Sequence, residues 1–422
     1  MRRHNLIPTL LSFLGCIRFC DGFVPAVQAS FQATERHLEG SHRRHHRQRV
    51  AFGPLHAESQ DGVSSKPIVA IVGSGAVGCY YGARMWETNN YDVRFHMRGD
   101  HYTASQANGL NVTSYYGDIF IPPDEIGAYD DVNDMGVADW VIVALKSTSL
   151  EAAPDLIRPL LGKHTRVLAI MNGMIDQDLV DMLENGGSND DEGTRQQHHH
   201  PAGVAATPQK LTCCRAVYAG MALVCSNKLA PGRVDHSYAG KLTGALSASS
   251  AEEWNLHGNQ DAERQAFYDL WKDTKSIEHV YDEDLTRARW SKMCWNLPFN
   301  GISVAMGGIT IDKVVGDAGL KRLAYAVIDE TIAAANADLE SKGADPSTYL
   351  GDVEKEAMMD LSCTMGPYKP STMLDFTNRR PMEVKYLFRK PLDRANQLNV
   401  PVPHLETLVA QIEAFQRMYD LY

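Results

Sequence analysis

Residues 67–86 read PIVAIVGSGAVGCYYGARMW, and this stretch decides the fold class. Residues 68–72 form a continuous apolar run rich in β-branched side chains, which is typical of a strand buried on both faces of a parallel sheet. Glycines with the spacing GxGxxG follow at residues 73–78, and residues 79–86 have helical character. The glycine pattern alone is a weak signal, but a strand, these glycines and a helix in this order predict a dinucleotide-binding unit.

Each glycine of the turn has a physical role in such a unit. Gly73 permits the tight turn, Gly75 lets the backbone approach a pyrophosphate, and Gly78 lets the helix pack close to the strand. The N-terminus of the helix then faces the anionic group. A glycine-rich turn without a ligand is the alternative, and the combination of strand, glycines and helix disfavours it. We therefore expect the pyrophosphate to bind a loop made of Gly73, Ser74, Gly75, Ala76, Val77 and Gly78.

The end of a second expected strand, over residues 91–97, bears on the choice of cofactor. Folds of this kind that are specific for NAD usually place Asp or Glu there, to bind the ribose 2′-hydroxyl. Arg98 stands at that position, and a guanidinium suits the 2′-phosphate of NADP. Asp100 would be the acidic residue if the strand ended later. The sequence therefore favours NADP over NAD.

Two further buried strands, over residues 139–145 and 166–171, end at polar side chains. Lys146 follows the first strand and Asn172 follows the second. Polar residues just past the carboxyl ends of parallel strands line the crevice in which doubly wound folds bind ligands. Lys146 also fits a solvated lysine at a helix start, and Asn172 a turn residue before glycine. Their position makes both of them candidate site residues.

The rest of the first domain contains two more expected strands and two polar stretches. The strands lie over residues 216–225 and 233–246. The stretches at residues 185–210 and 247–261 are predicted to be polar insertions, the first of them disordered. Three histidines at residues 198–200 could hold a metal ion, but no residues that would orient them are evident. We expect no metal site.

The character of the sequence changes after about residue 282. No long strand-like run follows, and apolar residues recur with helical periodicity almost to the end of the chain. We therefore expect an α/β Rossmann-type domain with a parallel sheet over residues 67–281 and an all-α domain over residues 282–422. Helices are expected in the second domain over residues 283–295, 319–342, 351–358, 383–398 and 404–419.

Length, charge and cysteine usage restrict the class of protein. The chain has 422 residues and a formal net charge of −11 at pH 7. This length is enough for two ordinary domains. The acidic balance argues against a nucleic-acid partner, because phosphate recognition requires a basic surface. The cysteines after the first 66 residues have no CxxC pair and no zinc-ligand spacing, so we expect reduced thiols.

The first 66 residues are basic, whereas the remainder of the chain is strongly acidic. Their apolar run, residues 6–20, is too short and interrupted for a membrane span and resembles the core of a signal peptide. The basic, His-rich residues 41–50 follow it, as in a bipartite leader for a plastid. We expect residues 1–66 to be a targeting leader and the mature protein to be organellar, in a plastid rather than a mitochondrion, without a membrane partner. Secretory and cytoplasmic localisations are the alternatives.

A line of polar residues runs along and beyond the helix expected over residues 283–295. Lys292, Asn296 and Asn300 are spaced by four, so they lie nearly on one face, among apolar neighbours. A lysine in such a setting would be costly unless it met a substrate carboxylate, a carbonyl or a cofactor. A surface lysine followed by two capping asparagines is the alternative. Pro298 is expected to kink or end the regular helix between the asparagines.

Taken in order, these motifs resemble the signature of the ketopantoate reductase family. The similarity covers residues 67–420 with similar spacing, apart from the two polar stretches. The motifs that carry it are residues 73–78, Lys146, residues 172–174, the Lys292, Asn296 and Asn300 line, and residues 371–383.

The resemblance implies roles for individual residues. Lys292 matches the general acid that protonates the ketone oxygen while NADPH delivers hydride to the carbonyl carbon. An ammonium in a dry cleft can both stabilise the developing alkoxide and supply its proton. The implied substrate-binding residues are Asn172, Asn296, Asn300 and Ser371. Besides the glycine loop and Arg98, the implied cofactor-binding residues are Lys146, Asn172 and Glu383.

The implied activity is NADPH-dependent reduction of 2-dehydropantoate (ketopantoate) to (R)-pantoate, in pantothenate and coenzyme A biosynthesis. Departures from the family pattern concern the substrate: Thr310 stands where some members have a further Asn, and Met382 and Val384 replace Thr and Ile. A dehydrogenase for a related 2-keto acid or of the opine type is the alternative enzyme. An NADPH-binding sensor without catalysis is the alternative from another class. The sequence does not indicate the oligomeric state, and a homodimer is considered.

Overall fold

The strand predicted at residues 68–72 lies near the middle of the sheet. β1 (Ile68–Val72) pairs in parallel with β2 (Asp92–His96) on one side and with β6 (Trp140–Val143) on the other. β6 pairs in parallel with β7 (Arg166–Ala169). The four strands predicted to be buried therefore form the parallel centre of the sheet.

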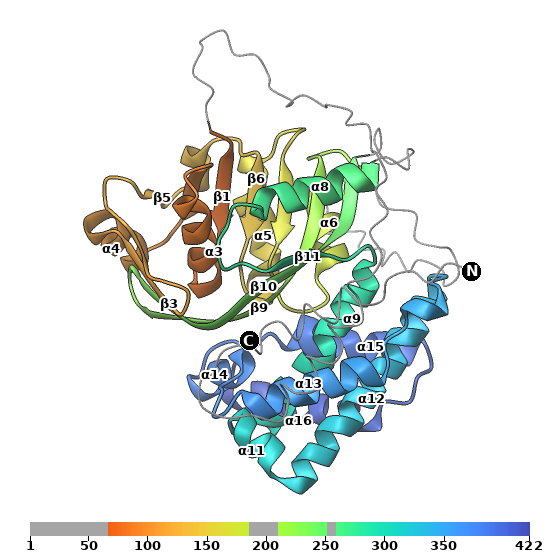
Figure 1. Cartoon of the computed structure of the whole chain (residues 1–422). Helices are drawn as coiled ribbons and strands as arrows, with labels where there is room; N and C mark the ends of the chain where they lie inside the picture. The colour runs from red at the N-terminus through yellow and green to blue at the C-terminus, as the bar shows by residue number, and fades with distance from the viewer. Residues whose placement is uncertain (1–65, 185–209, 251–258) are drawn as a thin grey trace, which may run out of the picture. The chain divides into compact units, whose positions relative to one another are not determined.

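The structure is a computed structural model that describes residues 66–184, 210–250 and 259–422 (Figure 1). The leader predicted over residues 1–66 lies outside the described residues, apart from Lys66. The insertion predicted over residues 185–210, which includes the three histidines, also lies outside them, apart from Lys210.

Both faces of the central strands are buried, as their apolar runs predict. Along β1, Val69 and Ile71 contribute to one hydrophobic core, and Ala70 and Val72 contribute to the other. This alternation follows from the pleat, which turns successive side chains to opposite faces. A strand with two buried faces has to be apolar at every position, which explains the run.

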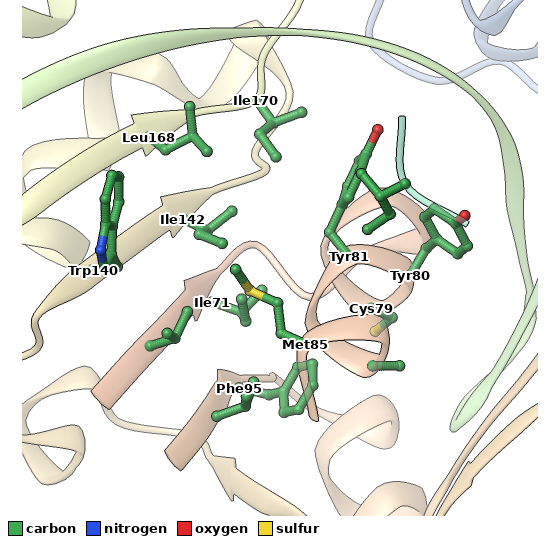
Figure 2. Close-up of a cluster of buried hydrophobic side chains, with 14 of the residues drawn as sticks. Ile71, Cys79, Tyr80, Tyr81, Met85, Phe95, Trp140, Ile142, Leu168 and Ile170 are labelled. Atoms are coloured by element: carbon green, nitrogen blue, oxygen red, sulfur yellow. The ribbon is translucent and has the colours of Figure 1, made fainter. Parts of the chain in front are cut away.

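Helices close the two cores. α3 (Ala76–Glu87) and α8 (Asn259–Trp271) lie on one face, and α5 (Ala153–Ile157) and α6 (Asp176–Glu184) lie on the other. Figure 2 shows the first core, where Met85 of α3 extends towards Ile71 on β1. The packing of α3 on β1 holds the glycine-rich turn between them.

The sheet is mostly parallel, as predicted, and becomes antiparallel at one long hairpin. β9 (Ala216–Ala230) pairs in parallel with β7 but antiparallel with β10 (Arg233–Ser250). Only Pro231 and Gly232 connect the two strands. A two-residue connection can only reverse the chain, whereas parallel neighbours need a crossover of a dozen or more residues.

The strand order of the whole sheet is β4-β3-β10-β9-β7-β6-β1-β2-β5, and β8 and β11 also pair with β10. Five short strands are not indicated by the sequence: β3 (Leu110–Ser114), β4 (Ile119–Ile121), β5 (Gly127–Tyr129), β8 (Lys210–Leu211) and β11 (His279–Tyr281). Apart from β3, which has five residues, these strands have at most three residues and are too short for a recognisable alternation.

The polar stretch predicted over residues 247–261 is shorter in the structure than in the prediction. Residues 247–250 are the end of β10, which pairs there with β8 and β9, and residues 259–261 begin α8. The sequence at this end of β10 is Ser-Ala-Ser-Ser, which has little strand propensity of its own. Pairing with strands from elsewhere in the chain decides its conformation.

Helices make up the remainder of the chain, as predicted (Figure 1). Its α-helices are α9 (Leu285–Trp295), α10 (Gly301–Ala305), α11 (Ile311–Gly316), α12 (Ala318–Ser341), α13 (Asp352–Thr364), α14 (Ser371–Thr377), α15 (Lys390–Gln397) and α16 (Pro403–Tyr419). Two π-helical turns, η5 (Asn296–Asn300) and η7 (Lys385–Arg389), interrupt the series. The boundary predicted near residue 282 falls between β11 and α9, within the single compact unit formed by residues 66–422.

The described residues lack the features of membrane-spanning helices, metal-binding clusters and disulfides. None of the helices in the described ranges is both long and apolar enough to cross a membrane. Across the same ranges, no group of three or more His, Cys, Asp or Glu side chains is arranged to hold a metal ion. The cysteines there are free thiols, namely Cys79, Cys213, Cys214, Cys225, Cys294 and Cys363.

Candidate active site

Lys292 lies in the last turn of α9 and faces β9. Its Nζ donates a hydrogen bond of 2.7 Å to the carbonyl oxygen of Ala222. Burial lowers the pKa of Lys292 to about 8; the nearby Cys225 acts in the opposite direction, and the charge of Arg289 lowers the pKa further. Such an ammonium is still mostly protonated at neutral pH, yet it gives up its proton more readily than an ordinary lysine. Both properties suit a general acid.

The polar line continues through the π-turn η5. Pro298 has no N–H to donate to the carbonyl oxygen of Cys294, so a regular α-helix cannot run through this position. α9 accordingly ends at Trp295, and regular α-helix resumes only at Gly301. The interruption predicted from Pro298 is confirmed. π-turns of this kind are frequent at functional sites.

The two asparagines of the line contact each other. Asn300 Nδ2 donates to Asn296 Oδ1 at 3.3 Å, and Asn300 Oδ1 accepts from the backbone N–H of Thr372 at 3.1 Å. Asn296 is 4% exposed and Asn300 is 1% exposed. Among the described residues, Asn296 Nδ2 has no hydrogen-bond partner. A buried donor without a partner costs about 1–3 kcal/mol, so this amide is a group that a ligand could satisfy.

Two hydroxyl groups begin α14. Ser371, the predicted substrate contact, is its first residue and is exposed. Thr372 is buried, and its Oγ1 has no hydrogen-bond partner among the described residues. Because the Thr372 backbone also contacts Asn300, this hydroxyl group lies beside the polar line. Sequence reasoning missed Thr372, and its only signal is its place next to Ser371.

Glu383 contacts the residues that follow two neighbouring strands, β6 and β7, and it lies far from both of them in the sequence. Its Oε1 accepts hydrogen bonds from the backbone N–H of Ser147 at 2.8 Å and from the Ser147 hydroxyl at 3.1 Å. Its Oε2 accepts from Asn172 Nδ2 at 3.2 Å. Glu383 is buried and comes two residues before η7. The structure thus brings together the predicted residues Asn172 and Glu383 and adds Ser147, which the sequence did not single out.

The loop after β7 is pressed against η7. Gly173 has φ +87°, and a Cβ at this position would lie 2.6 Å from the carbonyl carbon of Tyr386. The backbone N–H of Met174 donates to the carbonyl oxygen of Tyr386 at 2.9 Å. Only glycine allows this approach and this backbone conformation. The contact keeps Asn172 beside Glu383.

Lys146 forms an ion pair with a residue from the helical part of the chain. Its Nζ donates to Asp375 Oδ1, which also accepts from Arg380 Nε at 3.1 Å. The Asp375 side chain is 2% exposed, whereas that of Lys146 is 47% exposed. Lys146 therefore reaches from the end of β6 to α14 with its ammonium still partly accessible to solvent.

The glycine-rich turn is crowded on the side of the helix and open at Gly75. A Cβ at Gly78 would lie 2.3 Å from the carbonyl oxygen of Gly73, so the helix and the turn are in close contact. A Cβ at Gly75, by contrast, would meet no atom within 4 Å. No side chain caps the N-terminus of α3, and the buried Ser74 Oγ has no partner among the described residues. The open side of the turn thus offers hydrogen-bond donors to an anion.

Arg98 lies two residues beyond the end of β2 and is exposed. It forms no ion pair within the residues that the structure describes. Asp100 is the first residue of α4 (Asp100–Asn108), so it belongs to the next helix and not to the strand end. Arg98 is therefore the first charged residue that follows this strand in the sequence.

Arg289 attaches the helix of Lys292 to the sheet. Its guanidinium donates to both carboxylate oxygens of Asp176 at 2.7 Å and to the carbonyl oxygen of Met171 at 2.9 Å. Arg289 is 3% exposed, so a two-pronged ion pair is shielded from solvent. The contact joins α9 to the end of β7 and the start of α6, close to Asn172.

The candidate residues form groups that share structural elements. α14 carries Thr372, which contacts Asn300, and Asp375, which pairs with Lys146. η7 follows Glu383 and packs against η5. The polar line, the two strand ends and the start of α14 are thereby connected, whereas their roles towards a ligand stay predictions.

Fold and site together define a class of protein. A glycine-rich turn with an open side follows the carboxyl end of the parallel strand β1, which is where Rossmann-type folds bind dinucleotides. A lysine with a lowered pKa next to an unpartnered amide adds a proton donor. The class is that of the oxidoreductases that use a nicotinamide dinucleotide.

Within this class, the chain belongs to the ketopantoate reductase PanE/ApbA family. The model of this family matches residues 69–246, and the model of its C-terminal part matches residues 284–416. The resemblance of the sequence motifs is thereby confirmed.

Individual relatives agree with this assignment. The chain is similar to a 2-dehydropantoate 2-reductase of Nostoc sp., with 30% identity over 82% of this chain and 93% of the relative. A crystal structure of 2-dehydropantoate 2-reductase from Geobacter metallireducens GS-15 has 27% identity and a TM-score of 0.67, covering 82% and 99% of the chains. D-mandelate dehydrogenase with NADH and anilino(oxo)acetate has a TM-score of 0.65, covering 84% and 100%. At 17% identity, that likeness shows the fold alone.

Proposed function

We propose that this chain reduces 2-dehydropantoate (ketopantoate) to (R)-pantoate with NADPH, as a step of pantothenate and coenzyme A biosynthesis. The observation that carries the proposal is Lys292, a partly buried lysine with its pKa lowered to about 8, on one line with a buried and unpartnered amide. Membership of the ketopantoate reductase family supports the choice of substrate. So does the name of the relative from Nostoc sp..

Different residues of the chain have different roles in ketone reduction. Bound NADPH would supply the hydride. Lys292 stabilises the negative charge that develops on the ketone oxygen and then donates its Nζ proton to that oxygen. Asn296 offers its free amide N–H groups to an oxygen of the 2-keto acid. Amide groups orient the substrate without adding a charge that would oppose the ammonium.

The residues of the glycine-rich turn fit a dinucleotide, and we assign the cofactor site to them. Residues 73–78 would hold the pyrophosphate at the open side of the turn. Arg98, exposed and without an ion pair in the described part of the chain, would hold the 2′-phosphate of NADP. Lys146, Asn172 and Glu383 would lie towards the nicotinamide end, since they meet at the ends of β6 and β7.

The proposal is tested by following the loss of NADPH absorbance with purified residues 67–422. Ketopantoate is offered beside pyruvate, 2-ketoisovalerate and 2-ketoisocaproate. Fast oxidation with ketopantoate alone is the expected result. Oxidation with another keto acid instead would keep the chemistry of Lys292 but would contradict the substrate.

Two alternatives remain outcomes of the same assay. A preference for pyruvate, 2-ketoisovalerate or 2-ketoisocaproate would favour a dehydrogenase for a related 2-keto acid or of the opine type. Tight NADPH binding without any oxidation would favour a sensor. The buried Asn296 amide and the lowered pKa of Lys292 argue for catalysis, since a sensor needs neither.

We also propose that residues 1–66 direct the chain to an organelle, a plastid rather than a mitochondrion. The basic composition and the apolar run at residues 6–20 support this proposal. Fusing residues 1–66 to a fluorescent protein tests it. Plastid fluorescence and a shortened mature N-terminus are expected, and a uniform cytoplasmic signal would contradict the proposal.

A further inference from the structure

Three carbonyl oxygens lie in the glycine-rich turn, and they are held in two different ways. Those of Gly73 and Gly75 accept from backbone N–H groups of the same segment, from Gly75 at 2.8 Å and from Cys79 at 3.0 Å. The carbonyl oxygen of Ser74 accepts instead from the thiol of Cys79 at 3.4 Å, and Cys79 is 0% exposed. The direction of the Ser74 oxygen therefore depends on a side chain. If the peptide group after Ser74 turned over, this oxygen would leave the buried thiol and face the open side of the turn.

His101, the second residue of α4, contacts this thiol and also the tip of the hairpin between β9 and β10. Its Nδ1 accepts from the backbone N–H of Gly232 at 2.9 Å, and its Nε2 lies 3.5 Å from Cys79 Sγ. The hairpin tip is itself fixed, because the carbonyl oxygen of Gly232 accepts from the backbone N–H of Asn111 at 2.9 Å. The imidazole ring thus connects a distant segment of the sheet to the glycine-rich turn.

The partners of the ring fix the direction of each hydrogen bond. A backbone N–H can only donate, so Nδ1 of His101 carries no proton of its own. Burial lowers the pKa of His101 and the charge of Lys228 lowers it further, against a hydrogen bond to the backbone of Ser74. The ring is therefore neutral at pH 7, and its one proton lies on Nε2, which donates towards Cys79 and Ser74. Burial also raises the pKa of the Cys79 thiol to about 12, so this thiol keeps the proton that it donates to Ser74.

We propose that His101 and Cys79 are positioning residues for the cofactor, which hold the Ser74 carbonyl oxygen inside the fold so that the turn presents only donors to the pyrophosphate. The proposal rests on the proposed function, because it takes the ligand of the turn to be NADPH. A carbonyl oxygen on the open side would face the negative charge of the pyrophosphate and would take the place of a donor. Both residues act on the cofactor through this peptide group and not by contacts of their own.

Two substitutions at His101 separate the two nitrogen atoms of the ring. His101→Asn can place Oδ1 where Nδ1 was, so it keeps the acceptor for Gly232 but loses the donor towards Cys79. His101→Gln is longer, and its Nε2 can reach the thiol while its Oε1 faces Gly232, so it keeps the donor. We expect the Kd of NADPH to rise about 3- to 10-fold in His101→Asn, the usual contribution of one hydrogen bond, and to stay within about 2-fold in His101→Gln. Fluorescence titration measures both values, and equal losses in the two variants would overturn the proposal.

Binding of NADH shows which part of the cofactor is affected. NADH and NADPH share the pyrophosphate, so His101→Asn should weaken the binding of both by the same factor. A loss confined to NADPH would assign the effect to the 2′-phosphate and would overturn the proposal. His164→Asn, at an exposed histidine in the loop before β7, is the matched control and should leave both Kd values within about 2-fold.

Cys79→Ala tests the second positioning residue. It removes the thiol donor, so the Kd of NADPH should again rise about 3- to 10-fold. Combined with His101→Asn, it should raise the Kd by less than the product of the two single effects, because both side chains act on one carbonyl oxygen. A full product, as independent sites give, would overturn the joint action. Cys363→Ala removes an exposed thiol and is the control for this variant.

The position of the proton can be checked in the unmodified chain. Nitrogen-15 NMR of histidine-labelled protein distinguishes a protonated ring nitrogen from an unprotonated one, and the signals of His101 are identified by their loss in His101→Asn. At neutral pH we expect the proton of His101 on Nε2 and none on Nδ1. A proton on Nδ1 would contradict the order of hydrogen bonds and overturn the proposal, even if a variant failed to fold.

Failure of this proposal can be told apart from failure of the proposed function. If the chain binds NADPH with the expected pattern among the variants but reduces no 2-keto acid, the proposed function alone is overturned. If it reduces ketopantoate while both His101 variants bind NADPH equally, the positioning role alone is overturned. If the unmodified chain binds neither NADPH nor NADH in the titration, both are overturned.

Discussion

The proposed dinucleotide end of the site, residues 73–78, and the proposed substrate end are built in different ways. The turn to which we assign the pyrophosphate consists of six consecutive residues, 73–78, and the backbone makes its shape. The substrate end combines α9, η5 and α14, with β9 behind Lys292. A site made by the backbone of one short segment can be read from the sequence. A site made by side chains from several segments can be read only where a resemblance already names them.

The two ends of the site also differ in how far apart their contacting residues lie in the sequence. The close contact at the glycine turn joins Gly73 to Gly78, which are only five positions apart in the chain. The carboxylate of Glu383 accepts hydrogen bonds from residues 236 and 211 positions earlier. Local contacts depend on residue type and backbone conformation, whereas distant contacts depend on how the whole chain packs.

The largest expected effect is at the substrate end. Lys292→Ala removes the proton donor, so kcat should fall by about 100- to 10,000-fold, the usual contribution of a general acid. The dinucleotide end should not respond, and the Kd of NADPH should stay within about 2-fold, because distant sites behave independently. Stopped-flow NADPH oxidation and fluorescence titration measure the two quantities. Lys313→Ala, at an exposed lysine of α11, is the control, and unchanged turnover in Lys292→Ala would contradict the assignment of the acid.

Two glycine variants test the dinucleotide end by itself. Gly75→Ala meets no atom of the chain, so it should fold normally and weaken NADPH binding about 10- to 100-fold by blocking the approach of the pyrophosphate. Gly78→Ala places a methyl group 2.3 Å from a backbone oxygen, so it should destabilise the fold by about 2 kcal/mol or more. Urea unfolding and NADPH titration distinguish the two. Equal stability loss in both variants would contradict the shape of the turn.

Arg98 tests whether the choice of cofactor is also a property of the dinucleotide end. Arg98→Ala should weaken NADPH binding about 10-fold or more, by the loss of a charge-assisted contact to the 2′-phosphate. Binding of NADH should change little, since NADH lacks that phosphate. The ratio of the two Kd values is the measurement. A parallel loss of both affinities would show that Arg98 supports the fold and does not select NADP.

The lowered pKa of Lys292 predicts how the rate depends on pH. The acid has to be protonated in the free enzyme, so kcat/KM should be level below pH 7 and should fall about tenfold per pH unit above a pKa of about 8. The profile is recorded at saturating NADPH in a buffer series of constant ionic strength. A rate that rises through pH 8 would mean that the essential group acts as a base.

The smallest expected effect concerns stability. Burial disfavours the ammonium of Lys292, so below pH 8 it destabilises the folded chain relative to a neutral side chain. Lys292→Met should therefore raise the free energy of unfolding at pH 7 by about 1 kcal/mol. As the pH rises from about 8 towards the ordinary lysine value of 10.5, the folded chain loses this proton before the unfolded chain does. The difference should then shrink, and urea unfolding at pH 7 and pH 9.5 checks it.

The fold could be predicted where a local pattern was strong. The runs at β1 and β6 are apolar at every position because both faces are buried, and the long helices α12 and α16 bury apolar residues at helical spacing. The hairpin of β9 and β10 was predicted as two strands, but its antiparallel pairing depends on the two-residue connection between them. The end of β10 and the short strands could not be predicted, because pairing partners elsewhere in the chain hold them in place.

The site shows the same limit. Pro298 predicts the interruption of the helix, because proline lacks the N–H that a regular α-helix needs at this position. No local sequence pattern predicts that Asp375 pairs with Lys146, or that Ser147 donates to Glu383. Thr372 stands inside a recognised motif, yet only its burial and its missing partner mark the hydroxyl.

The sequence by itself determined the strand, the glycine-rich turn and the helix of the dinucleotide end, because steric limits on a few consecutive residues decide their shape. It also placed Lys292, Asn296 and Asn300 on one line, because the helical period does so. Only the tertiary structure decided the pKa of Lys292 and the direction in which the Asn296 amide points. Both depend on burial and on hydrogen bonds from distant segments, and these exist only when the whole chain is folded.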